Sequence, residues 1–147
     1  MSEPVESPQV PRVLVLGNTP IARAVVGVGI AIGYEVVSFD ASALDGAAAV
    51  VLASHGGPDE DAALRAALAT DVPYIGLVAS RARGQGVVTG LGLDGAATAR
   101  IHTPAGLDIG AGTPEEVALA ILAEVVATRP RVPGQSRAAR GKRTCDH

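Results

Sequence analysis

The 147-residue sequence has few aromatic side chains, with two tyrosines, one phenylalanine and no tryptophan. Hydrophobic residues nevertheless make up 48% of the chain, so the core must be built from Val, Leu, Ile and Ala packed against Gly. That composition suits a parallel sheet covered by helices on both faces, because such strands are apolar on both sides. The shortage of aromatics therefore favours an α/β protein.

Paired cysteines, membrane-length apolar runs and a secretion signal are also missing. The only cysteine, Cys145, has no partner, which excludes an intrachain disulfide. The longest apolar run, residues 24–32, is far shorter than the roughly 20 residues that cross a bilayer. The first ten residues are polar and contain proline, unlike a signal peptide. We therefore expect a soluble, cytoplasmic protein that makes no membrane contact.

Positive charge is scarce outside the C-terminal end. The formal net charge is −3, but six of the 12 basic residues lie in residues 129–147. Residues 1–128 hold six basic and 14 acidic side chains, a formal charge of −8, which excludes recognition of nucleic acid by a basic surface. We interpret residues 1–11 as a flexible leader, residues 12–128 as one domain and residues 129–147 as a disordered basic tail.

The sequence does contain a regular alternation of strand and helix patterns, in which short apolar runs predict strands and longer periodic segments predict helices. The predicted strands are residues 12–16, 35–39, 48–53, 72–78 and 100–103, and the predicted helices are residues 20–32, 58–70, 80–91, 94–100 and 114–127. This alternation predicts a single doubly wound, Rossmann-like α/β domain with a parallel five-stranded sheet.

The link between the second and third predicted strands decides the strand order. It has only about seven residues, whereas a parallel crossover usually needs a dozen or more. We therefore predict that this link crosses over the first strand, which gives the order 2-1-3-4-5. Ligands of such sheets bind beyond the carboxyl ends of the strands, at the point where the strand order reverses. The sequence thus predicts a site between the first and third strands.

A turn after the first strand stands in the place of the dinucleotide fingerprint G-x-G-x-x-G. Gly17 is the first glycine, Thr19 replaces the second, and Ala22 is a tolerated replacement for the third. Asp40 follows Gly17 by 23 residues, where a ribose-binding acid is expected. A Cβ at Thr19 pushes a pyrophosphate away, and Asn18 or Thr19 can instead cap the helix. A dinucleotide site, a fold without such a site and a site for another phosphorylated ligand all stay open.

Further polar residues follow the third and fourth strands. They are Ser54, His55 and Gly56 after the third strand, and Ser80, Arg81 and Arg83 after the fourth. His55 would face the crevice as a base or a hydrogen-bonding group. Ser80 can cap a helix while the two arginines bind an anion. The alternatives are a solvated loop histidine and a capped, solvated helix start.

The most distinctive segment is the glycine loop, residues 106–112, which leads into the last predicted helix. Thr113, Pro114 and Glu116 form a capping-box pattern, with Thr113 as the N-cap. A helix start beside glycines favours an anion through its N–H groups and dipole, and the alternative is a tight turn before a well-capped helix. The candidate ligand residues are Gly106, Asp108, Gly110 and Thr113. Asp108 would contact a ligand hydroxyl or satisfy loop N–H groups.

No catalytic or metal site is predicted. The three histidines are far apart in sequence, and the cysteine lies in the tail. Neither a G-x-S-x-G motif nor a P-loop occurs. The only lysine, Lys142, is also in the tail, so no catalytic pair of tyrosine and lysine is evident. A binding protein is therefore favoured over an enzyme.

Several segments together resemble the C-terminal Rossmann domain of the XdhC/CoxI family, which comprises accessory proteins of molybdenum hydroxylases such as xanthine dehydrogenase and carbon monoxide dehydrogenase. The matching segments are residues 53–56 (ASHG), 59–64 (DEDAAL), 74–77 (YIGL), 80–81 (SR), 104–111 (PAGLDIGA) and 113–118 (TPEEVA). The resemblance covers about residues 12–128, and the last two segments are its most specific part.

The resemblance implies a role and partners. Members are expected to bind the molybdenum cofactor (molybdopterin), protect it, allow its sulfuration and transfer it to the apoenzyme. The family's first glycine loop usually reads G-x-G-H, whereas residues 17–20 read GNTP here. The family's separate N-terminal domain is not in this sequence. The implied partner is a molybdenum hydroxylase apoenzyme or a companion protein of the XdhC type, with a homodimer as a further arrangement.

The leading hypothesis is a non-enzymatic, chaperone-type module that acts in maturation of a molybdenum hydroxylase. It would bind either a phosphorylated pterin, namely the molybdenum cofactor, or a nucleotide. Its crevice would be built from Gly17, Asp40, His55, Arg81 and Asp108. The first alternative is an NAD(P)-binding oxidoreductase or regulatory domain, for which 147 residues leave no substrate domain. The second is a protein-interaction adaptor with a vestigial nucleotide pocket.

Overall fold

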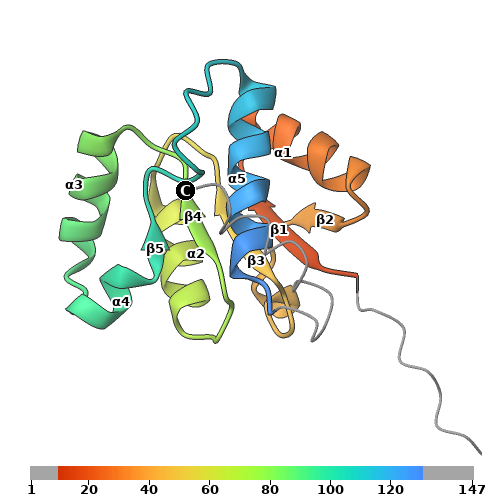
Figure 1. Cartoon of the computed structure of the whole chain (residues 1–147). Coiled ribbons are helices and arrows are strands. Elements are labelled where there is room, and N and C mark those ends of the chain that lie inside the picture. The colour runs from red at the N-terminus through yellow and green to blue at the C-terminus, as the bar shows by residue number, and fades with distance from the viewer. Residues whose placement is uncertain (1–9, 131–147) are drawn as a thin grey trace, which may run out of the picture.

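A computed structural model describes residues 10–130 of the chain (Figure 1). Its five strands are β1 (Arg12–Leu16), β2 (Glu35–Ser38), β3 (Ala49–Leu52), β4 (Ile75–Leu77) and β5 (Ile101–His102). They form one sheet in the order β2-β1-β3-β4-β5, and all neighbouring strands are parallel. The predicted fold class and strand order are confirmed. The predicted leader and tail fall largely on residues 1–9 and 131–147, which lie outside the described residues.

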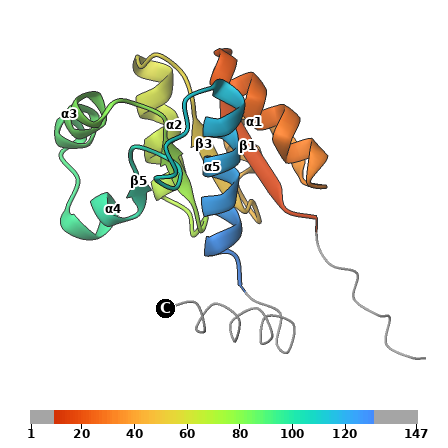
Figure 2. The same cartoon turned by 45° about the horizontal axis from the view of Figure 1, so that its top comes forward.

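Helices cover both faces of the sheet. They are α1 (Pro20–Ala31), α2 (Pro58–Leu68), α3 (Arg81–Leu91), α4 (Gly95–Ala99) and α5 (Pro114–Thr128), with a short 3-10 helix η1 (Ala41–Ala43). Helices α1 and α5 lie side by side on one face, as Figures 1 and 2 show. Helices α2 and α3 pack on the other face. The predicted helices all form, with ends that differ by two residues or fewer.

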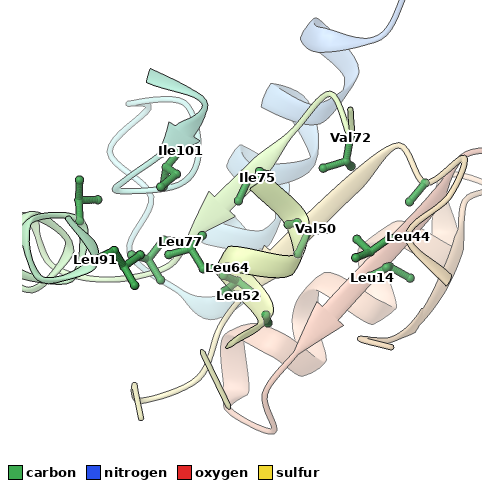
Figure 3. Packing of buried hydrophobic residues seen from close by; sticks show 14 residues of the cluster. Leu14, Leu44, Val50, Leu52, Leu64, Val72, Ile75, Leu77, Leu91 and Ile101 are labelled. Carbon is green, nitrogen blue, oxygen red and sulfur yellow. The ribbon is translucent and has the colours of Figure 1, made fainter. Parts of the chain in front are cut away.

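The core is divided into two layers because successive strand residues point to opposite faces of the sheet. In β3, Val50 and Leu52 belong to the cluster under α2 and α3, which Figure 3 shows. Ala49 and Val51 belong to the cluster under α1 and α5. All four side chains are buried, which explains why the strand reads as a continuous apolar run.

The link between β2 and β3 crosses β1 without a full helix. Leu44 from this link is buried in the cluster that contains Leu14 of β1, so one leucine covers part of the sheet face. The guanidinium of Arg12 holds the link in place, because its Nη1 donates to the backbone carbonyls of Ala43 (3.2 Å) and Asp45 (3.4 Å). The predicted crossing over the first strand is therefore confirmed.

Candidate functional site

Two adjoining pockets lie at the carboxyl ends of the strands. The main pocket, of about 620 Å³, is bounded by residues 78–81 after β4, the segment 104–111 after β5, and side chains of α1 and α5. A side pocket of about 400 Å³ shares Ile21, Val78 and Ala79 with it and extends to residues 53–55 after β3. The main pocket has a volume typical of small-molecule sites.

Part of the predicted set meets in the main pocket. Ser80, Arg81, Gly106, Asp108 and Gly110 line it. Its wall also includes the apolar side chains of Leu107, Ile109, Val117 and Ala120. The pocket therefore joins an apolar wall to a cation, an acid and loop backbone.

Arg81 and Asp108 are the charged side chains of the main pocket. Both are exposed, and neither forms an ion pair with any other residue in the described range. Arg81 is the first residue of α3, whose N-cap Ser80 accepts a hydrogen bond from the backbone N–H of Arg83 (3.1 Å). The guanidinium is thus available to a negatively charged ligand.

A close packing contact holds the start of α3 near the glycine loop. Gly84 is buried in the first turns of α3, and a Cβ at this position would overlap the hydroxyl of Thr103. Thr103 directly precedes Pro104, which lines the main pocket. The glycine therefore allows α3 and the segment after β5 to approach closely enough to share one pocket.

The glycine loop is fixed at its root and open along its middle. The backbone N–H of Gly106 donates to Oε1 of Glu124 in α5 (2.8 Å), and that of Leu107 donates to the carbonyl of Ala120 (3.2 Å). Gly106 has a φ of +106°, and a Cβ there would lie 3.2 Å from the Cβ of Ala120. Within residues 10–130, no hydrogen bond is donated by the backbone N–H groups of residues 108–111.

A buried tyrosine anchors the same glutamate. The hydroxyl of Tyr74 donates to Oε1 of Glu124 (2.6 Å), while Nδ1 of His102 lies 3.4 Å from Oε2. The ring of Tyr74 is fully buried and stacks on that of His102, with ring centroids 4.6 Å apart. Burial strongly raises the pKa of Tyr74, and the hydrogen bond and negative charge of Glu124 act in the same direction. The hydroxyl therefore stays protonated and keeps donating to Glu124.

The helix start after the glycine loop is satisfied by its own residues. The hydroxyl of Thr113 accepts from the N–H of Glu116 (3.0 Å), and Oε1 of Glu116 accepts from the N–H groups of Gly112 (2.8 Å) and Thr113 (3.2 Å). These bonds form the predicted capping box, and they lower the pKa of Glu116. Its carboxylate occupies the position at which an external anion would bind, and Thr113 lines neither pocket.

The turn between β1 and α1 is also closed by internal bonds. Gly17 has a φ of +125°, and a Cβ there would overlap the carbonyl group of Ala53. The hydroxyl of Thr19 donates to that carbonyl (2.7 Å) and accepts from the N–H of Ala22 (3.1 Å), so Thr19 is the N-cap of α1. Asn18 accepts from the guanidinium of Arg23 through its backbone and side-chain oxygens. Thr19 borders the side pocket, whereas Gly17 and Asn18 line neither pocket.

The two candidate arginines have different environments. Arg83 donates to Oε1 of Glu60 (3.0 Å) and to the backbone carbonyls of Val78 (3.1 Å) and Ser54 (3.3 Å). Glu60 is 1% exposed and also accepts from the hydroxyl of Ser54 (3.0 Å). The prediction that Arg83 binds an external anion with Arg81 is corrected, because Glu60 already pairs with Arg83.

The remaining predicted residues lie apart from the main pocket. His55 is exposed and lines the side pocket. Gly56 has a φ of +98° and borders a different pocket, between α2 and α3, where a Cβ would lie 3.2 Å from Nη1 of Arg83. Asp40 caps η1, accepting from the N–H and hydroxyl of Ser42 (3.0 Å each), and these bonds lower its pKa. Asp40 lines neither the main pocket nor the side pocket, which together we call the cleft.

Sequence reasoning missed the residues that hold the site together. Glu60, Tyr74 and Glu124 each pair with a residue distant in sequence, and periodicity does not reveal such pairs. A tyrosine inside an apolar strand is the one available signal, because a buried hydroxyl needs a partner. No group of three His, Cys, Asp or Glu side chains suited to a metal ion occurs between residues 10 and 130. Over the same range, no helix combines the length and apolar character needed to cross a membrane.

Comparison with known proteins identifies relatives of this chain. Residues 13–125 match the family model described as the XdhC Rossmann domain, which confirms the resemblance drawn from the sequence. An uncharacterized protein of Escherichia coli (strain K12), YqeB, is 39% identical over 66 residues, or 43% of this chain and 12% of that protein. A probable xanthine dehydrogenase subunit of Bacillus subtilis (strain 168) is 32% identical over 84 residues, or 57% of this chain and 24% of that protein.

The fold also matches a solved structure. The crystal structure of a xanthine dehydrogenase from Bacillus halodurans superposes with a TM-score of 0.64 and 17% sequence identity. The superposition covers 86% of this chain and 46% of that one, and at this identity it shows the fold alone. The chain spans less than a quarter of the length of each curated relative that it matches.

Proposed function

Because this chain belongs to the XdhC Rossmann-domain family, we propose that it is an accessory module of a molybdenum hydroxylase such as a xanthine dehydrogenase. We further propose that it binds the phosphorylated pterin of the molybdenum cofactor during maturation of that enzyme. The family match and the relative described as a probable xanthine dehydrogenase subunit support the first part. The main pocket supports the second.

One observation carries the cofactor proposal: one apolar-walled pocket is lined by Arg81 and by residues 108–111, whose backbone N–H groups donate no hydrogen bond within residues 10–130. A phosphate group pairs with a guanidinium and with backbone N–H groups. A carboxylate accepts hydrogen bonds from the ring N–H groups of a pterin. The apolar side chains of Leu107 and Val117 offer surfaces for the ring faces. The residues present therefore fit the organic part of the cofactor.

Each group has a separate task in this proposal. Arg81 neutralises the phosphate, Asp108 orients the pterin edge, and the Gly106–Glu124 bond holds the loop in its binding shape. The bound cofactor supplies oxidation–reduction chemistry only to the enzyme that receives it. An exposed guanidinium suits reversible transfer, because its contacts to a phosphate exchange readily with water.

Thermal unfolding of the full chain tests the proposal. Molybdenum cofactor, NAD(H) and NADP(H) are each added in excess to the wild type, to Arg81→Met and to the charge-matched control Arg65→Met, an exposed arginine of α2 outside the cleft. A ligand at 100 times its dissociation constant adds about 2.7 kcal/mol to the free energy of unfolding. The midpoint of the wild type should then rise by several degrees with the molybdenum cofactor.

Arg65→Met should keep that rise, and Arg81→Met should lose most of it. A rise with a nicotinamide nucleotide alone would replace the cofactor proposal with an oxidoreductase or regulatory domain. If no ligand moves the midpoint, the cofactor part is wrong and the adaptor function takes its place.

A further inference from the structure

The turn between β1 and α1 has little capacity left for a phosphate. In dinucleotide-binding sheets, the pyrophosphate lies on the N-terminus of the first helix, where a second glycine lets the backbone approach. Here Thr19 stands at that glycine position. The hydroxyl of Thr19 donates a hydrogen bond to the carbonyl of Ala53 and accepts one from the N–H of Ala22. The side chain therefore fills the approach and uses one of the helix donors.

The other donors of this helix start are reduced as well. Pro20 is the first residue of α1 and has no N–H group. The N–H of Arg23 is bonded to the carbonyl of Thr19 (2.9 Å). Among residues 20–23 at the start of α1, Ile21 is then the residue whose N–H group is not used by these bonds. A pyrophosphate on residues 20–23 would therefore meet the N–H group of Ile21 as the one unused donor of that segment, and a threonine side chain in place of a glycine.

The free positive charge lies in the main pocket, which Thr19 and Pro20 do not line. Among the described residues that line the main and side pockets, the arginines are Arg81 and Arg83. Arg83 is neutralised by Glu60, so Arg81 alone is available to a phosphate. Asp108 lies in the same pocket and adds a negative charge. One free cation beside one acid suits a single terminal phosphate better than the two linked phosphates of a dinucleotide.

We propose that the cleft selects ligands with one terminal phosphate, held at Arg81, and that Thr19 and Pro20 exclude the pyrophosphate of a dinucleotide. The inference rests on the proposed function and specifies the form of the ligand. Thr19 and Pro20 are specificity-determining residues of the side pocket, which they line together with Ile21. In this proposal the main pocket holds the pterin and its phosphate, and no part of the ligand extends past Ile21 into the side pocket.

Isothermal titration of the full chain compares two probes: molybdopterin with its terminal monophosphate, and the cytidine dinucleotide of the same pterin. The wild type should bind the monophosphate form at least roughly tenfold more tightly, since the dinucleotide leaves charged oxygens without partners. Thr19→Gly removes the obstructing side chain and should reduce this preference several-fold. Thr19→Ser, the matched control, keeps the hydroxyl and Cβ and should retain the wild-type preference.

Pro20→Ala provides a second test that keeps the Thr19 cap. It restores an N–H group at the first helical position and should also strengthen dinucleotide binding. Equal affinity of the wild type for both probes would overturn this inference and leave the proposed function standing. A preference unchanged in both Thr19→Gly and Pro20→Ala would overturn the role of the turn. Absence of binding by either probe would overturn the proposed function and this inference with it.

Discussion

Two turns of this molecule share a local sequence pattern but differ in how many of their hydrogen-bonding groups are left for a ligand. The β1–α1 turn and the glycine loop before α5 both begin with a glycine at positive φ that packs against backbone or a neighbouring helix. Both continue into a threonine N-cap followed by proline, Thr19-Pro20 and Thr113-Pro114. In the first turn, Pro20 follows Gly17 by three positions, and the hydroxyl of Thr19 is bonded to Ala53 and Ala22 of the protein itself. In the second, Pro114 follows Gly106 by eight positions.

The difference in length decides what remains for a ligand. The short turn reaches directly from β1 to α1, so Thr19 bonds both the neighbouring strand end and the helix. The longer loop is tied at one end by Glu124 and at the other by Glu116, which leaves the N–H groups of residues 108–111 between the ties. Glycines and a helix start are therefore insufficient evidence of an anion site, and the partners of each N–H group must be known.

The same contrast separates the two arginines of α3, and it gives the largest predicted effect. Arg83→Met leaves the carboxylate of Glu60 buried beside Ser54 without its cation. We expect the free energy of unfolding to fall by about 3 kcal/mol, measured by urea denaturation. Arg81→Met, the matched control, should change it by less than about 0.5 kcal/mol, since Arg81 is exposed and unpaired in the described range. Equal effects of the two substitutions would contradict the contrast.

Loss of the tie at the root of the glycine loop should have the next largest effect. Glu124→Ala removes the acceptor of the Tyr74 hydroxyl and of the Gly106 N–H. A buried hydroxyl without a partner lowers the free energy of unfolding by about 2 kcal/mol. Amide hydrogen exchange should also become faster at Gly106, whereas Glu124→Gln retains an acceptor and should protect it. Unchanged exchange in Glu124→Ala would mean that this bond does not hold the loop.

Alkaline pH offers a test of the same anchor without a substitution at the loop. The pKa of Tyr74 is raised in the folded protein, chiefly by burial, so the hydroxyl stays protonated there while it ionises in the unfolded chain above a pH of about 10. Its contribution to stability is present below that pH and is lost as the pH rises further. The free energy of unfolding should fall by up to about 1.4 kcal/mol per pH unit. Tyr74→Phe should lack this component of the slope.

Substitution of the two threonine caps should have the smallest of the predicted effects. Each substitution to alanine should cost about 1 kcal/mol through the lost cap. Thr19→Ala should cost more than Thr113→Ala, because Thr19 also donates to the carbonyl of Ala53. Thermal unfolding of the two variants measures the difference. A larger loss in Thr113→Ala would show that the tie to Ala53 contributes nothing to the first turn.

The fold was predictable because its signals are local. A continuous apolar run predicts β3, and Thr19, Ser80 and Thr113 cap helices at the expected positions. The short link even determines the strand order, since steric limits on crossovers leave few alternatives. The predicted strands were longer than the observed ones mainly at β4, where the prediction began at Val72 and the strand begins at Ile75.

The site was harder to predict because its decisive contacts are distant in sequence. The run Asp59-Glu60-Asp61 indicates a helix start, but nothing in it shows that Glu60 alone is buried and paired 23 residues away. Likewise, Tyr74 and Glu124 are 50 residues apart. These pairs decide that Arg83 is internal and that the glycine loop is anchored. The location of Arg81 and Asp108 in one pocket follows from the same three-dimensional arrangement.

The link between β2 and β3, which contains the short 3-10 helix η1 in place of a full α-helix, affects how the sheet opens. Within the described part of the chain, strand β2 lies at the edge of the sheet and pairs only with β1. Its residues are exposed or half-buried, and the link with Leu44 covers part of the sheet face beneath it. Edge strands with a thin cover separate first in thermal fluctuations. Opening of β2 leaves β3, β4 and β5 paired, and the main pocket stands on β4 and β5. Fraying at β2 therefore leaves in place the strands whose carboxyl ends bound the main pocket.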